Sequence, residues 1–230
     1  MSFNTRIDYY GQSASTVLEL TGSSENATFT VDATATNTRG DVIARDTSAA
    51  TRAAATCDFK VKAAGTVSPS LGAVTTVDTV VHCLTGVSIN TKAGTPPTVS
   101  LKGESLQAAA TVSSTIAVGT ITLAALHKAQ ILMAAFTITG AGCYLDDCSL
   151  ECNGALTRAT KDGATLAHDI HGASIVVTGK VIQSTATPPV IAAESGWKIT
   201  APATHGEPDE QNFVEWSFAV TKDLVSVEPV

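Results

Sequence analysis

Alternation of apolar and polar residues with a period of two is the feature that most constrains how this chain can fold. In the range Phe213–Thr221, every second position holds an apolar residue: Val214, Trp216, Phe218 and Val220. Successive side chains of a strand point to opposite faces, so this pattern predicts a strand with one face buried. We therefore expect Trp216 to lie in the core.

The same alternation predicts further strands along the chain. Thr28–Thr36 alternates apolar residues with threonine and aspartate. Arg39-Gly40-Asp41 then supplies a turn, and Val42–Arg45 is expected to return as a partner strand. Ala173–Ile182 is rich in β-branched residues and predicts a strong strand in the second half. Recurrent strands joined by turns are typical of antiparallel β proteins.

Glycine and proline predict where strands are interrupted. Val74–Asn90 is rich in Val and Thr, and we expect it to hold two strands broken near Gly86. Gly94–Pro97 and Thr187–Pro189 each contain two consecutive prolines. Proline cannot donate a hydrogen bond to a ladder, so both segments are predicted to be loops.

One segment has the composition of a helix. Leu123–Ala134 is rich in Ala, Leu, Met, Lys and Gln, which favour helices, and we expect it to form the one substantial helix. The predicted fold is mainly β: a β-sandwich or barrel-like arrangement of antiparallel sheets with one flanking helix. It is either a single large domain over 1–230 or two related domains, 1–110 and 111–230. The two-domain option rests on a weak internal sequence similarity between Val87–Val99 and Gly179–Ile191.

A low and acidic charge excludes several classes of partner. Charged residues make up 15% of the chain and the net charge is -7. Such a chain lacks the basic surface that gives a protein affinity for nucleic acid, so we expect no sequence-specific nucleic-acid binding and no attraction to anionic membranes. The apolar stretch Ile121–Thr137 is interrupted by charged and polar residues, so no membrane insertion is expected.

Three cysteines close together invite comparison with a metal site. Cys143, Cys148 and Cys152 lie within one predicted strand, where the second and third share a face and the first points away. Residues 1–13 show no apolar signal segment, so we expect reduced thiols rather than disulfides. We interpret the three cysteines as structural and expect no bound metal or other cofactor.

A second cluster contains His168, Asp169 and His171. Two imidazoles with this spacing could reach a metal ion, with the aspartate orienting one of them. A polar hairpin edge is the favoured interpretation, because a turn signal precedes the cluster. Asp146 and Asp147 fall on opposite faces if extended, so they cannot flank one bond. Because the chain has no P-loop, nucleophile elbow or dinucleotide fingerprint, we expect no enzymatic activity and no catalytic residues.

The layout of the chain resembles that of bacteriophage tail tube and related virion proteins. The resemblance rests on the Thr/Ala/Val-rich, low-charge composition and on Gly196–Thr200, followed by a polar loop and Phe213–Thr221. It implies a subunit that is assembled in the host cytoplasm into virion rings that stack and conduct DNA. Its partners would be further copies and other virion proteins. A capsid decoration or adhesion module is the alternative.

One polar segment is predicted to take part in assembly. Pro202–Gln211 contains two prolines and few apolar residues, so its own contacts cannot order it. We expect this loop, with residues 1–13, to be ordered at a contact between subunits.

Overall fold

The fold of the chain is built from β-strands. The computed structural model describes residues 17–28, 31–47, 52–77, 80–106, 112–123, 131–132, 136–139, 143–161, 164–184, 189–193, 196–205 and 214–224. All regular elements within these residues are strands, which confirms the mainly β prediction. That part of the chain contains no helix with the length and apolar character of a membrane span.

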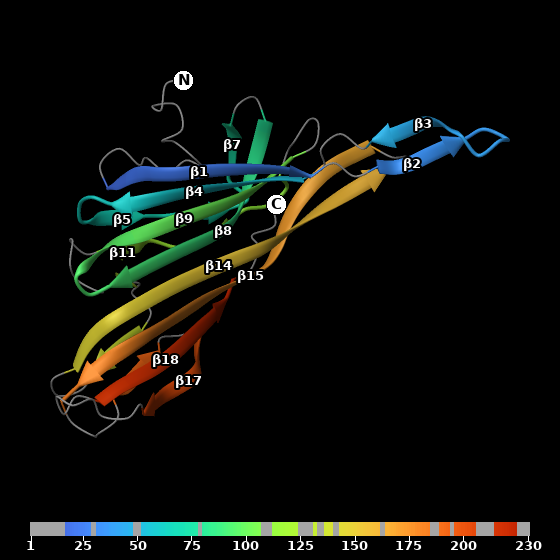
Figure 1. The fold of residues 1–230 in the computed structure, drawn as a ribbon. Helices are drawn as coiled ribbons and strands as arrows, with labels where there is room; N and C mark the ends of the chain where they lie inside the picture. The colour runs from blue at the N-terminus through green and yellow to red at the C-terminus, as the bar shows by residue number, and fades with distance from the viewer. Residues whose placement is uncertain are drawn as a thin grey trace.

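A nine-stranded antiparallel sheet forms the body of the molecule (Figure 1). In order across the sheet, its strands are β1 (Leu18–Thr28), β4 (Arg52–Val61), β9 (Thr95–Ser105), β8 (Val80–Lys92), β14 (Cys143–Lys161), β15 (Ala164–Gln183), β18 (Val214–Asp223) and β17 (Trp197–His205). The short strand β7 (Val74–Val77) also pairs with β8. The pairing of β8 with β14 joins the N-terminal strands to the C-terminal strands in one sheet.

Residues that are paired on neighbouring strands point to the same face, so the alternation along each strand produces rows of apolar or polar side chains across this sheet. One buried row consists of Phe59, Val99, Ile89, Leu150, Val177 and Val220, each opposite the next on the neighbouring strand. The adjacent row on the other face consists of Asp58, Ser100, Ser88, Glu151, Val176, Thr221 and Lys198. Burial of the apolar rows stabilises the sheet by about 1.5–3 kcal/mol for each large side chain.

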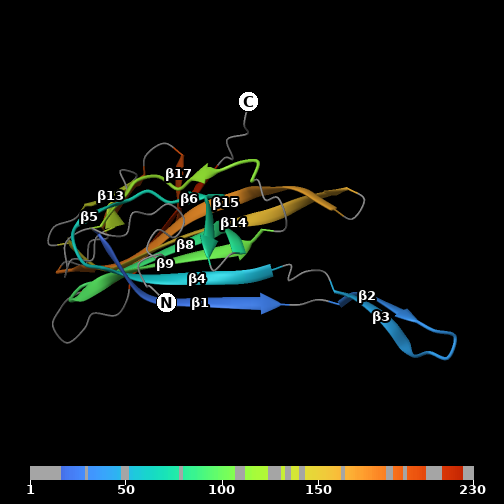
Figure 2. The same ribbon diagram turned by 90° about the horizontal axis from the view of Figure 1, so that it is seen from above.

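A second layer of short strands covers the apolar face (Figure 2). It consists of β5 (Gly65–Val67), β11 (Ile121–Leu123) and β12 (Ile131–Leu132), then β6 (Ser70–Leu71) with β10 (Ile116–Ala117), and β13 (Phe136–Thr139) with β16 (Val190–Ala193). Leu71, Ile116 and Ile121 from this layer share one core with the rows of the large sheet. Two layers around a common core agree with the expected sandwich.

An arm projects from one end of the body. It consists of β2 (Val31–Thr36) and β3 (Val42–Thr47), which pair only with each other among the described strands. Both views show it extending away from the large sheet (Figures 1 and 2). The predicted hairpin, with its turn at Arg39-Gly40-Asp41, is confirmed.

The predicted helix is wrong where the structure describes it. Leu123 ends β11, and Ile131 and Leu132 form β12, which pairs with β11. The remaining residues of Leu123–Ala134 lie outside the described residues. Local helix propensity is a weak preference, and pairing to β5 and β12 outweighs it here.

Two predicted strand breaks are misplaced. Gly86 lies inside β8, and the described residues place the break after Val77 instead. The register of β8 against β9 shifts between Leu84 and Gly86, so the glycine accommodates an irregularity rather than a turn. Pro96 and Pro97 lie in the first residues of β9, beyond the last pair that joins β9 to β4. Proline is tolerated there because no donor is required.

The expected assembly loop is shorter than predicted. Pro202–His205 belongs to strand β17, and residues 206–211 and 1–13 lie outside the described residues. Pro202 falls where the register of β17 against β18 shifts, at the margin of the sheet. Proline is tolerated in an edge strand because the outer side of that strand has no partner to which a backbone N–H must donate.

Replacing Gly179 with alanine should lower the free energy of unfolding by about 1–3 kcal/mol. A Cβ there would lie 2.7 Å from Cζ of Phe218 and 2.8 Å from the carbonyl oxygen of Asp147, so the packed ring or the backbone must move. Urea unfolding measures the change. Gly22→Ala is the control, because its Cβ would meet only a side-chain oxygen of Asp58 at 3.8 Å. Equal stability of the two variants would contradict the proposed crowding.

Candidate functional site

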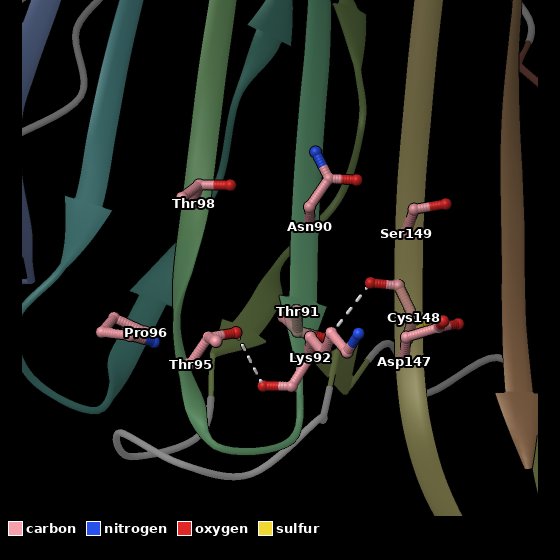
Figure 3. A pocket seen from close by; sticks show the side chains of 9 residues that line it. All are labelled: Asn90, Thr91, Lys92, Thr95, Pro96, Thr98, Asp147, Cys148 and Ser149. Carbon is pink, nitrogen blue, oxygen red and sulfur yellow. Dashed lines mark hydrogen bonds between the residues drawn. The ribbon is translucent and has the colours of Figure 1, made fainter.

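A polar hollow lies where three strands meet near the end of the large sheet (Figure 3). Its volume is about 430 Å³, and its lining comes from β8, β9 and β14. The lining residues are Asn90, Thr91, Lys92, Thr95, Pro96, Thr98, Asp147, Cys148 and Ser149. This volume lies within the usual range of ligand pockets, about 300–1,000 Å³.

Charged residues of alternating sign cross the sheet at the hollow. Asp147 on β14 is paired in register with Lys92 on β8 and with Lys180 on β15. The amine of Lys180 lies 2.9 Å from a carboxylate oxygen of Glu215 on β18. The hydrogen bond and the charge of Glu215 raise the pKa of Lys180. Opposite charges on neighbouring strands support the pairing and give the hollow one cation and one anion.

Hydrogen bonds fix the floor and rim of the hollow. The Thr91 hydroxyl donates to the carbonyl of Cys148 at 3.1 Å, and the Thr95 hydroxyl donates to the carbonyl of Lys92 at 3.1 Å. The Ser149 hydroxyl lies 2.7 Å from that of Thr178. These bonds hold β8, β14 and the start of β9 together, so the polar side chains are presented from a rigid sheet.

The hollow is suited to binding rather than to covalent chemistry. Its groups are hydroxyls, an amide, one carboxylate and one ammonium, with the Cys148 thiol buried toward the core. Burial raises the pKa of that thiol to about 12, with a smaller contribution from the charge of Asp147. A thiol that stays protonated is a poor nucleophile. The arrangement favours recognition of a partner that carries both charges.

Two of the three clustered cysteines lie in the core on one strand. Cys148 and Cys152 are buried on the apolar face of β14, as the alternation predicted. Burial raises the pKa of Cys152 to about 12. The side chain of Cys143 is not among those described. Among the described residues, no group of three His, Cys, Asp or Glu side chains is placed to hold a metal ion.

The two histidines lie on opposite faces of β15. His168 is 1% exposed and His171 is exposed, so one ion cannot bind both at this spacing along a strand. The interpretation as a polar hairpin edge is wrong for His168, which lies in the interior. The segment 112–114 crosses here: the Ser113 amide donates to the His168 carbonyl at 2.8 Å, and the Ser114 hydroxyl bonds to Asp169.

Comparison with known proteins gives no family for the chain. No protein-family model matches it, and no curated protein is significantly similar to it.

The sequence pointed to Asp147 and Cys148, but not to the residues of β8 and β9 that line the hollow with them. Asp147 was noticed as half of an acidic pair, and its partner Lys92 lies far away in the sequence. Alternation along Val87–Lys92 places Asn90 and Lys92 on the same, polar face of the strand. The register of β8 against β14 is what brings Lys92 and Asp147 together.

Proposed function

We propose that this chain is a structural virion protein, a self-assembling tail tube subunit that forms stacked rings through which DNA passes. The observation that carries the proposal is a large antiparallel sheet that is open at both margins. Within the described residues, β1 pairs only with β4 and β17 only with β18. Unpaired strand edges are templates for pairing with another chain.

The rows of the sheet support closure between copies. The buried apolar row continues beyond Phe59 to Leu20 on β1 and beyond Val220 to Ile199 on β17. Ile199 is 44% exposed, although it belongs to an apolar row. If β17 of one copy lies beside β1 of the next, Leu20 and Ile199 meet and the row continues from subunit to subunit. A cyclic arrangement of such contacts gives a ring.

The opposite face of the sheet is suited to a channel wall. Away from the hollow, its exposed residues include Thr178, with the acidic residues Asp58 and Glu151 interspersed among lysines. Hydroxyls, amides and balanced charges offer no continuous basic track, so few counterions would be released from DNA on contact. DNA can therefore pass without sticking, and the wall needs no catalytic group.

The alternative of a capsid decoration or adhesion module receives less support. A glycan platform needs an exposed aromatic ring, and the Trp197 side chain is only 9% exposed. The amine of Lys222 lies 6.0 Å from its centroid. A strictly monomeric protein that binds virions or glycans would favour this alternative over the tail tube.

Replacing Ile199 with aspartate should prevent ring and tube formation at the concentration at which the unmodified chain assembles, while the monomer stays folded. A charge at the margin would have to be desolvated between copies, and loss of the isoleucine contact alone removes about 1.5–3 kcal/mol per interface. The concentration needed for assembly should rise at least roughly tenfold. Light scattering and electron microscopy measure assembly, and thermal unfolding checks the fold.

Val74→Asp is the matched control for this experiment. Val74 is also 44% exposed, but it lies on β7, which is away from both margins of the sheet. We expect that variant to assemble like the unmodified chain. Assembly of Ile199→Asp at normal concentration, or a chain that stays monomeric without any substitution, would overturn the proposal.

A further inference from the structure

The tip of the arm is a rigid turn that presents two charges. The side-chain oxygen of Asn37 accepts the backbone amides of Arg39 and Asp41 at 2.9 and 3.0 Å. Its amide nitrogen donates to a carboxylate oxygen of Asp41 at 3.0 Å. Gly40 has a φ of 86°, with open space where a Cβ would lie. Arg39 and Asp41 are exposed, so the turn offers a cation and an anion from a fixed backbone.

The arm and the hollow lie at opposite ends of the molecule. The arm extends from the end of the body where β14 turns into β15 (Figure 1). The hollow lies at the other end, beside the turn between β8 and β9. The second view also shows the arm at the end opposite to the turn between β8 and β9 (Figure 2). A projection at one end and a receptor at the other form a heterologous pair, which builds open stacks rather than closed dimers.

We propose that the Asn37–Asp41 turn of one copy docks in the hollow of another copy, with Arg39 beside Asp147 and Asp41 beside Lys92. The proposal rests on the proposed function and names the contact through which successive rings stack. Each surface carries one cation and one anion. The two surfaces are complementary when the cation of each lies beside the anion of the other. Asp41 can accept from Lys92 because a carboxylate offers more acceptor sites than Asn37 uses.

Three observations favour a second copy as the occupant of the hollow. A hollow of about 430 Å³ can receive the end of a turn, and its rim is polar like the tip. The arm is a two-stranded hairpin with no further strand beside it in the described structure, and such hairpins are only marginally stable alone. Docking would supply the arm with a partner. Every copy carries both surfaces, so the contact needs no other protein.

Cross-linking between copies tests the contact directly. One chain carries Thr38→Cys at the tip, and a second, tagged chain carries Asn90→Cys at the hollow. Both chains also carry Cys143→Ser, so that the thiol of Cys143 cannot react with the cross-linker. A short bismaleimide should join tagged to untagged chains. Thr38→Cys with Lys102→Cys is the control, because Lys102 is exposed on the same face of the sheet but does not line the hollow. We expect at least about tenfold more cross-linked pair in the first mixture.

Charge reversal then identifies the pairing. Arg39→Glu should reduce the cross-link at least roughly tenfold, and Asp147→Lys in the partner should restore it. Equal cross-linking with and without Arg39→Glu, or equal yields from Asn90→Cys and Lys102→Cys, would overturn the docking. Rings that still form by electron microscopy in that case would leave the proposed function standing. A cross-link without any rings or tubes would instead support the docking and contradict the tube.

Discussion

Raising the pH from 10 to 11 should lower the free energy of unfolding by about 4 kcal/mol. Burial raises the pKa of Cys83, Cys148 and Cys152 to about 12 from the usual 9.0. Above pH 9 the unfolded chain loses these protons while the folded chain keeps them, so stability falls as the pH rises. Each thiol contributes about 1.4 kcal/mol per pH unit until its folded pKa is reached.

A total stability of about 5–15 kcal/mol means that this loss brings the protein close to alkaline unfolding. Urea titrations at several pH values measure the slope. Cys152→Ala is the control, since lysines and tyrosines titrate equally in both proteins. Its slope between pH 10 and 11 should be smaller by about 1.4 kcal/mol per pH unit. An unchanged slope would contradict the assignment to buried thiols.

Truncating Trp216 to alanine should lower the free energy of unfolding by about 3–5 kcal/mol. Its burial was predicted from alternation and is confirmed, because the side chain is 4% exposed. Trp216 packs in a small cluster with Val181, Val214 and Phe218, separate from the main core. The cavity would lie on the apolar face over β15 and β18, beside Leu145 and Ile191.

Tyr144→Ala is the matched control for the loss of an aromatic ring. Tyr144 is 68% exposed, so its truncation should change stability by no more than about 0.5 kcal/mol. Chemical unfolding measures both variants, and iodide quenching of tryptophan fluorescence checks the burial of Trp216. Equal stability of the two variants would show that Trp216 does not hold the cluster together.

Strands could be predicted wherever the alternation is local and unbroken. Phe213–Thr221 and Ala173–Ile182 correspond to β18 and to part of β15 because one buried face fixes the parity of every residue. The hairpin around Gly40 was also predictable, since its turn and both strands lie within one short segment.

Features that depend on distant pairing could not be predicted. Leu123, Ile131 and Leu132 lie among residue types that favour helices, yet Leu123 pairs with β5 and β12, and Ile131 and Leu132 pair with β11. The hollow has the same origin, because Lys92 and Asp147 meet only through the register of β8 against β14. No local pattern carries that register. The resemblance to tail tube proteins implied assembly but gave no residues for its contacts.

The junction between β8 and β14 has a consequence for synthesis on the ribosome. Strands β1, β4, β9 and β8 are complete once Ser105 has been made, but the strand that covers β8 begins only at Cys143. At about 5–20 residues per second, the edge of β8 stays unpaired in the nascent sheet for several seconds. An exposed edge of this kind invites pairing with a neighbouring nascent chain. Slowing translation after Ser105 should therefore increase aggregation, whereas supplying residues 143–223 as a separate chain should reduce it.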